Sequence, residues 1–512
     1  MAGYDYFAGG GRAPKMILNQ HGEPFRLGAY YRASRQTRET RGLYSVCQRP
    51  HEEVTSTDLA RLRARCRFVY KNYPQAAGVI DRIVRRVVSG GLRIQSRMRN
   101  RQGDYLRDEN ERLETIINDA WRRNPLKPWS GFAANGQSFK RTMELALRTR
   151  LIDGGGLLIA STSSDERRAI SREWQLVDVD RLAETQSYEQ IQPKMGGDKV
   201  VQGIEVTKAG RPVAYHIYKD GGNVWDAPHD TEAIPAERVI HWFKPDRPDQ
   251  VRGIPFLAKL LLSFADVEEF AKTKIQAEWI ANSFAGFRKY ENPENLPPPS
   301  ETITNEAGRE EYYEDIHAGT ISDLPAGVSM EFANPNRPGG QMEDFMRVYL
   351  RAQAVACGQS YEEFAGDYSN ASYSAMKAAY AESSFSYKDW SDECDEQIDP
   401  IWRDVIDHVF VIHGLMEAPR DAVDLTAHYV QHPRPGYIEP TKEAAAEKIV
   451  IDNKLNSRRR LLAERELDFY EVMDELAEEE EYIRERGLDT KVAEKKMAAT
   501  IQQIPSKGRG IG

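Results

Sequence analysis

The feature that most constrains the fold is a regular apolar pattern over residues 255–286. Apolar side chains recur there at steps of three and four residues, the period of one face of an α-helix. They are Leu257, Leu260, Leu261, Phe264, Val267, Phe270, Ile275, Trp279 and Phe284. Pro255 stands at the expected start, where a missing backbone N–H is tolerated, and Gly286 at the expected end. The pattern predicts a single helix of about 30 residues, roughly 45 Å long.

A second long helix is predicted over residues 373–413, with Pro400 inside it. Proline lacks a backbone N–H and its ring clashes with the preceding turn, so we expect a kink at Pro400. Further helices are predicted at residues 57–70, 74–88, 105–123, 136–149 and 342–357, with a last helical block over 440–486.

Between residues 155 and 245 the apolar period changes to two, which is typical of strands. Strands are predicted at residues 157–159, 174–177, 200–206, 213–218 and 239–243, and another at 92–95. Three glycines, 154–156, come just before the first of them. A phosphate-binding loop would need a helix after its glycines, so a tight turn is the better interpretation. Helices and strands therefore mix, and the fold class is α+β.

The charge of the chain is unevenly distributed. Of 512 residues, 40% are hydrophobic and 29% charged, which supports a core beneath a highly charged surface. Residues 1–150 hold 29 Lys and Arg against 14 Asp and Glu, whereas the remainder holds 41 against 65. Two interpretations stand side by side: different partners for the basic and acidic parts, or a basic part that is simply a solvated face.

The sequence predicts a soluble protein of a reducing cytosol. The most apolar run, residues 254–265, is interrupted by Lys259 and is too short to cross a bilayer. Residues 1–11 lack the apolar segment of a signal peptide. The four cysteines have neither metal-knuckle nor redox-pair spacing, so we expect free thiols.

No motif of a catalytic, metal or cofactor site is present in the sequence. A nucleotide-binding Gly-x-x-x-x-Gly-Lys-Ser/Thr loop, a His-Glu-x-x-His zinc helix and a Gly-x-Ser-x-Gly elbow are all missing. Adjacent carboxylates such as Glu268 with Glu269 are more simply a solvated helix face than a metal site. The sequence therefore predicts no enzyme, no metal and no cofactor.

Four short motifs, in order along the chain, resemble one family. Residues 203–215 read Gly-Ile-Glu-Val followed by Gly-Arg-Pro-Val-Ala-Tyr, and residues 252–255 read Arg-Gly-Ile-Pro. Residues 359–374 contain Gln-Ser-Tyr-Glu-Glu-Phe and then Asp-Tyr-Ser-Asn-Ala-Ser-Tyr-Ser. Residues 440–444 read Pro-Thr-Lys-Glu-Ala before an acidic helical tail. Together these segments resemble the portal proteins of lambda-like tailed bacteriophages, with Phe364 where an aliphatic residue is more usual.

The resemblance implies a portal fold: a mixed α/β wing, stem helices flanking a clip, a tunnel loop, a kinked helix and a helical crown. The expected parts are an N-terminal arm (1–55), wing (56–252), first stem helix (253–286), clip (287–340), second stem helix (341–357), tunnel loop (358–372), kinked helix with return to the wing (373–439), and crown with tail (440–512).

The resemblance also implies a function. A ring of about twelve subunits would form the channel for packaging and ejecting double-stranded DNA at one capsid vertex, after assembly in the host cytoplasm. Its partners would be the terminase large subunit, a head–tail adaptor, and the major capsid and scaffolding proteins, without a membrane. The tunnel-loop residues expected near DNA are Glu362, Glu363, Asp367, Tyr368 and Asn370. The clip residues expected at docking partners are Pro297, Pro298, Pro299, Tyr312 and Tyr313.

Simple geometry agrees with a ring of that size. Twelve helices of about 10 Å diameter make a circumference near 120 Å and leave a lumen of roughly 28 Å, which passes a duplex of roughly 20 Å. Two alternatives remain open. One is another phage capsid or scaffolding component, and the other is a metal-dependent nuclease that uses the carboxylate pairs.

Overall fold

The structure is a computed structural model. It describes residues 56–90, 92–127, 129–183, 192–219, 231–289, 302–304, 310–312, 320–324, 341–369, 372–433, 440–458, 461–462, 467 and 469–486. All of them belong to one unit, which extends from Val54 to Gly512.

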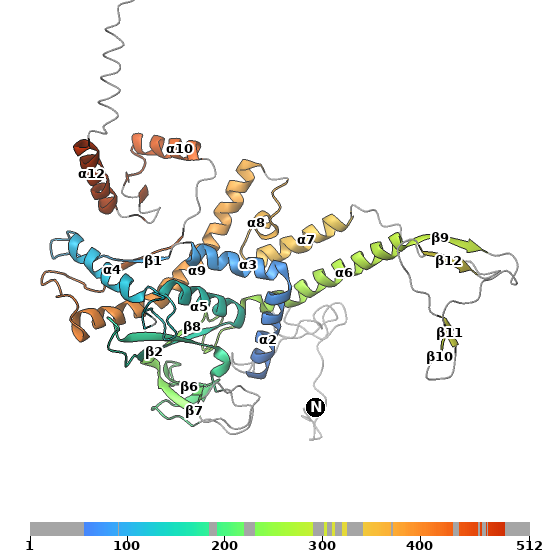
Figure 1. Cartoon of the computed structure of the whole chain (residues 1–512), viewed down its shortest axis with the longest axis horizontal. Coiled ribbons are helices and arrows are strands. Elements are labelled where there is room, and N and C mark those ends of the chain that lie inside the picture. Colours follow the sequence, from blue (N-terminus) through green and yellow to red (C-terminus); the bar gives the residue numbers. More distant parts are fainter. Residues whose placement is uncertain are drawn as a thin grey trace, which may run out of the picture. The chain divides into compact units, whose positions relative to one another are not determined.

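The first part of this unit is mainly helical (Figure 1). Its helices are α2 (Ser56–Asn72), α3 (Pro74–Val84), α4 (Arg107–Trp121) and α5 (Phe139–Asp153), and a π-helical turn over Arg85–Ser89 extends α3. Helices α2, α3 and α5 contact one another. Pro74 begins α3 where its missing N–H is tolerated, and the Ser138 side chain caps α5 by accepting from the backbone N–H of Arg141.

Two antiparallel sheets follow. The first has the order β3-β2-β8 and the second β4-β5-β6-β7. The strands are β2 (Gly156–Thr162), β3 (Arg172–Val177), β4 (Lys199–Val201), β5 (Ile204–Val206), β6 (Pro212–Tyr218), β7 (Thr231–Pro235) and β8 (Val239–Trp242). Strand β1 (Arg93–Ser96) pairs with β13 (His428–Gln431), which brings a late segment of the chain back to an early one.

The α+β fold class is confirmed, with corrections of detail. The stretch 200–206, predicted as one strand, is a hairpin of β4 and β5 that turns at Gln202 and Gly203, both with positive φ. Sequence reasoning missed β7 and β13 because both are short and weakly alternating. The glycine turn before β2 is present: Gly154 ends α5 with φ +86°.

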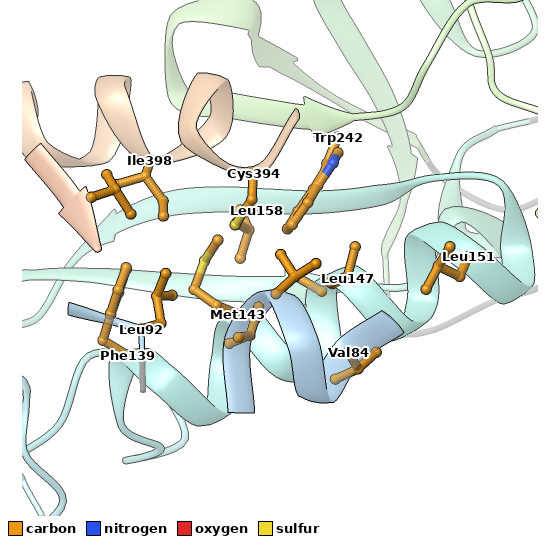
Figure 2. Close-up of a cluster of buried hydrophobic side chains, with 14 of the residues drawn as sticks. Val84, Leu92, Phe139, Met143, Leu147, Leu151, Leu158, Trp242, Cys394 and Ile398 are labelled. Carbon is orange, nitrogen blue, oxygen red and sulfur yellow. The ribbon is translucent and has the colours of Figure 1, made fainter. Parts of the chain in front are cut away.

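The main core lies between the helices and the first sheet. Figure 2 shows its centre, where Met143 and Leu147 of α5 meet Leu158 of β2, Trp242 of β8 and Ile398 of α9. Trp242 is fully buried, and its indole N–H donates to Glu393. A smaller core packs the first sheet against the second through residues such as Leu157 and Ile217. Helix α9 therefore belongs to the α/β core although it is far along the chain.

Two helices connect this body to a set of short strands. They are α6 (Leu261–Ser283), preceded by a 3-10 turn over Phe256–Leu260, and α7 (Gln341–Ala356). The strands are β9 (Phe284–Lys289), β10 (Thr302–Thr304), β11 (Glu310–Tyr312) and β12 (Thr320–Leu324), paired β9 with β12 and β10 with β11. The predicted helix end at Gly286 was wrong. The α-helix stops at Ser283, and Gly286 lies within β9.

The described C-terminal part is mainly helical, with strand β13 between its helices. Helix α9 (Tyr373–Asp407) continues through Pro400 and passes into a π-helical turn over His408–Ile412. Among its described residues, the expected helical block after residue 440 includes α10 (Pro440–Asp452) and α12 (Phe469–Glu485). Arg107 of α4 reaches α12 through Glu478, at 2.7 Å.

Candidate functional site

The segment between α7 and α9 is more ordered than the loop that the sequence predicts. A short helix, α8 (Tyr361–Ala365), lies between Gly358 at φ +67° and Gly366 at φ +68°. The Ser360 hydroxyl caps α8 by accepting from the backbone N–H of Glu363, and Ser372 caps α9 in the same way. The predicted loop over 358–372 therefore contains a short helix between two left-handed turns.

Glu363 anchors this short helix to the body. Its side chain is buried, and Oε1 accepts from Arg86 Nη2 at 3.2 Å and from the Tyr387 hydroxyl at 3.0 Å. The Arg86 guanidinium also lies 5.4 Å from the ring centroids of both Tyr380 and Tyr387. Burial, and then the nearby carboxylate, raise the pKa of Tyr387, so its hydroxyl stays protonated and donates. Arg86, Glu363 and Tyr387 therefore form one clamp, here called the Glu363 clamp.

Two further bonds hold the start of α8. The backbone N–H of Ser360 donates to the Ser383 hydroxyl of α9 at 3.0 Å, and Arg82 Nη1 of α3 donates to Gln359 Oε1 at 3.2 Å. Phe364 is buried in the main core. The position of α8 is therefore set jointly by α3, the π-helical turn and α9.

Three of the five predicted tunnel-loop residues lie on the outer side of this segment. Glu362 and Asp367 are partly exposed, and Tyr368 is 50% exposed. The Ser369 backbone N–H and hydroxyl donate to Asp367 Oδ1, and the Tyr361 hydroxyl donates to Oδ2. These bonds hold the pKa of Asp367 below its usual range, so the carboxylate stays charged.

The other two predicted residues differ. Glu363 is buried in its clamp, and this position argues against its contact with DNA. Asn370 lies outside the described residues. The clip residues Pro297, Pro298, Pro299 and Tyr313 also lie outside them, and Tyr312 is the last residue of β11. Their predicted roles stay predictions.

Sequence reasoning missed Arg86 and Tyr387, which lie far from α8 in sequence. The one local signal was the pair Arg85-Arg86 within the apolar run Ile83 to Val88. A charged pair inside such a run indicates a buried partner, but the partner cannot be identified without the fold.

The Arg-Gly-Ile-Pro motif fixes the point where α6 leaves the body. Arg252 is buried, and its guanidinium donates to the carbonyl of Val179. Gly253 lies against the backbone of Gly154: a Cβ on Gly154 would stand 2.7 Å from the Gly253 carbonyl oxygen. Each position requires glycine because two backbones approach closely here.

Helices α6 and α7 form an antiparallel pair beyond this point. Gln353 donates to the Ser263 hydroxyl at 2.9 Å near the body, and the rings of Phe270 and Phe345 are 4.5 Å apart farther along. Several large apolar side chains on this pair nevertheless remain exposed. They are Leu262 (81%), Ile275 (67%), Trp279 (56%), Val348 (63%) and Val355 (78%).

Within the described residues, no group of three or more His, Cys, Asp or Glu side chains could hold a metal ion. None of the described helices is long and apolar enough to cross a membrane. The buried thiols of Cys66, Cys357 and Cys394 are free, as expected from their spacing.

Comparison with known proteins decides the family. The sequence profile described as "Phage portal protein, lambda family" matches residues 36–390, more than half of the chain. The chain belongs to the lambda family of phage portal proteins. The matched part includes α6, α7, α8 and the first half of α9, so the site described above lies inside the portal family region.

Two curated relatives carry portal names. The "Probable portal protein" of Halomonas phage phiHAP-1 is 24% identical over 300 residues, which cover 57% of each chain. The "Portal protein" of Escherichia phage N15 is 20% identical over 352 residues, which cover 63% of this chain and 64% of that protein. The match thus spans less than two thirds of either relative.

Solved structures of gene transfer agent particles also match, at low scores. A chain from the "Virion of native gene transfer agent (GTA) particle" gives a TM-score of 0.39 at 13% identity, covering 80% of this chain and 93% of that one. A chain from the "Neck of native GTA particle computed with C12 symmetry" gives 0.40 at 14% identity, covering 80% and 94%. These scores carry no argument about how the elements are arranged.

Proposed function

We propose that this portal protein assembles into a ring of about twelve copies that forms the channel for double-stranded DNA at one vertex of a phage capsid. DNA would enter through the ring during packaging and leave through it during ejection. The ring itself performs no chemistry in this proposal; ATP hydrolysis belongs to the terminase large subunit that docks on it. A head–tail adaptor replaces terminase, and the major capsid and scaffolding proteins surround the ring during assembly in the host cytoplasm.

The observation that carries the proposal is the exposed apolar surface of α6 and α7. Trp279 and Val355 are 56% and 78% exposed although they belong to long helices of a folded protein. Ile275 and Trp279 are four residues apart on α6, and Val348 and Val355 are seven apart on α7, so each pair lies on one face of its helix. Exposed apolar faces of this kind mark a protein–protein interface. In a ring each subunit contacts its neighbours through two different surfaces, so helix pairs that stand side by side would cover these residues.

The outer side of the α7–α9 connection supports a channel role. Glu362, Asp367 and Tyr368 combine negative charge with a hydroxyl that can meet phosphate or sugar. Phosphate attraction to Lys and Arg dominates tight nucleic-acid binding, so carboxylates here keep contacts with DNA weak and transient. A surface that must let a duplex slide requires such weak contacts.

The test is direct imaging of the purified protein. Electron microscopy and native mass spectrometry are expected to show closed rings with an axial hole, near twelve copies. A scaffolding component would instead give elongated monomers or small oligomers, and a capsid subunit would give shells or capsomers. Monomers at every salt concentration, or ATPase or nuclease activity that follows this chain through purification, would overturn the proposal.

The clip has its own test. Deletion of residues 297–313, which removes the paired strands β10 and β11, is expected to leave rings intact and to abolish docking of terminase and of the head–tail adaptor, because the Pro- and Tyr-rich sequence of this segment suits partner binding rather than a core. Loss of ring assembly with docking preserved would instead assign these residues to contacts between subunits.

A further inference from the structure

A cleft in the α/β body lies away from the α7–α9 connection. It has a volume of about 250 Å³ and lies between α4, β1, the beginning of α5 and Trp402 of α9. Its apolar lining consists of Leu92, Ile94, Ile117, Trp121, Phe139 and Trp402. Apolar clefts with a few polar groups at the edge are the usual form of binding sites.

The lining of this cleft carries a net positive charge, with three cations against one carboxylate. Arg93, Arg122 and Lys140 line it and are exposed, and none of them forms an ion pair with any described residue. The one carboxylate in the lining, Glu114, is engaged: its Oε1 accepts from the backbone N–H of Ser96 at 2.7 Å. The cleft therefore attracts a ligand with negative charge around an apolar group.

Strand β1 offers main-chain hydrogen bonds on the same side. Among the described strands it pairs with β13 alone, and the backbone N–H of Arg97 donates to the carbonyl of Ala427 in the same register. Antiparallel pairing alternates, so Arg93, Gln95 and Arg97 bond toward β13 while Ile94 and Ser96 turn their backbone groups the other way. The Ser96 N–H already donates to Glu114. Ile94 lines the cleft, and its backbone N–H and C=O are therefore the groups of β1 that can pair with an extended peptide.

The aromatic rings of the cleft disfavour a nucleotide. A base needs an open ring face to stack on. Trp121 is stacked with Phe139 at 4.8 Å between centroids, and Trp402 packs at 5.6 Å against His428. Trp121 and Phe139 each cover one face of the other, and Trp402 is 1% exposed, so little open ring face remains for a base.

A larger cleft, of about 540 Å³, has one cation without an ion pair to any described residue, Lys127, against three at the smaller cleft. Two of the cations in its lining are already paired, Arg167 with Asp165 at 2.6 Å and Arg168 with Glu173 at 3.5 Å. The combination of an apolar floor, three cations without an ion pair and the Ile94 backbone groups that turn away from β13 occurs at the smaller cleft.

We propose that the cleft between α4 and β1 binds an extended acidic peptide segment of a partner protein. One apolar side chain of that segment occupies the floor, its backbone pairs with Ile94, and its flanking carboxylates face Arg93, Arg122 and Lys140. The interaction goes beyond the channel function and would tether a second protein to the body of each subunit.

The test uses the full-length protein and a short fluorescein-labelled peptide of Asp and Glu with one central Leu, followed by fluorescence anisotropy. Binding is expected, and it should weaken as salt is added because exposed charges are screened. Arg122→Glu with Lys140→Glu is expected to reduce affinity by at least about tenfold, since attraction becomes repulsion. The matched control is Arg211→Glu with Arg420→Glu, two exposed arginines elsewhere, which should leave affinity unchanged.

Two further arms test the floor and the strand edge. A peptide with Ser in place of Leu, and one N-methylated at the Leu, should each bind more weakly than the parent. Asn118→Phe, which fills the cleft from its exposed edge, should block binding while circular dichroism remains that of the wild type.

Three outcomes would overturn the proposal. One is no binding to the wild-type protein, and another is equal loss in the control variant. The third is loss of subunit association in Asn118→Phe together with no peptide binding by the wild-type protein. The cleft would then be an interface between copies. Ring formation by the wild type is read separately, so failure of this proposal leaves the channel proposal standing.

Discussion

Arg86 and Glu363 stand 277 residues apart in sequence, and their side chains meet at 3.2 Å. Arg86 lies on the π-helical turn after α3, whereas Glu363 lies on the short helix α8. The pair thus ties the connection between α7 and α9 to the first helices of the body. Movement of α8 requires this contact, the Tyr387 bond and the aromatic contacts of Arg86 to break together.

The Glu363 clamp is expected to contribute measurably to stability. Glu363→Ala leaves Arg86 and Tyr387 without their buried acceptor, so it should lower the free energy of unfolding by about 1–3 kcal/mol. The neighbouring Glu362→Ala removes a partly exposed carboxylate and should change it by less than about 0.5 kcal/mol. Urea unfolding followed by tryptophan fluorescence compares the two. Equal effects would show that the clamp does not hold α8.

The two glycines that flank α8 provide a second prediction. Both have positive φ, so alanine at Gly366, where nothing lies within 4 Å, should cost about 1–2 kcal/mol from backbone strain alone. At Gly358 a Cβ would also approach the Ser386 hydroxyl oxygen to 2.4 Å, so Gly358→Ala should cost more. Adding Ser386→Ala to Gly358→Ala should recover part of the difference, and the same unfolding measurement shows whether it does.

The periodic parts of the fold could be predicted from the sequence. Helix α7 and strands β2, β3, β6 and β8 lie close to the predicted ranges because their apolar periods are clear. The end of α6 could not be predicted, because the apolar Phe284 continues the helical period although its backbone pairs with β12. Short helix α8 was missed since five residues are too few to establish a period.

The candidate site was predictable as a segment but not residue by residue. The motif over residues 359–374 located it. Its sequence cannot distinguish Glu362, which is partly exposed, from Glu363, which is buried, because both are acidic neighbours on one turn. The difference comes from Arg86 and Tyr387, which approach only once α3 and α9 are packed together.

A buried carboxylate in the body predicts a pH dependence of stability. Burial raises the pKa of Asp153 to about 6, against the opposing effect of Arg67 at 2.6 Å. An unfolded Asp titrates near 3.9, so between about pH 4 and 6 the folded state binds the extra proton. The contribution of Asp153 to the free energy of unfolding should therefore fall as pH rises through this window, while carboxylates with lowered pKa, such as Asp180 and Glu205, contribute with the opposite sign. Asp153→Asn should remove this part of the slope, while Asp119→Asn, exposed on α4, should keep it. Urea unfolding at several pH values measures the slope, and a slope unchanged in Asp153→Asn would contradict the prediction.

The outer carboxylates of the α7–α9 connection give the sharpest test of the channel. Glu362→Lys with Asp367→Lys reverses two charges per subunit, or about 24 sites in a ring of twelve, and so turns local repulsion of phosphate into attraction. Rings should still form, because neither side chain contributes to the Glu363 clamp. Electrophoretic shift should detect ring–DNA binding that weakens steeply with added salt, and phage carrying the variant should fail to package or retain DNA.

The matched control, Glu237→Lys with Asp246→Lys, reverses the same number of exposed charges on the body and should package normally. Normal packaging by the Glu362 and Asp367 variant would show that this connection faces away from the DNA, whereas failure of both variants would point to the net charge of the ring rather than to this position.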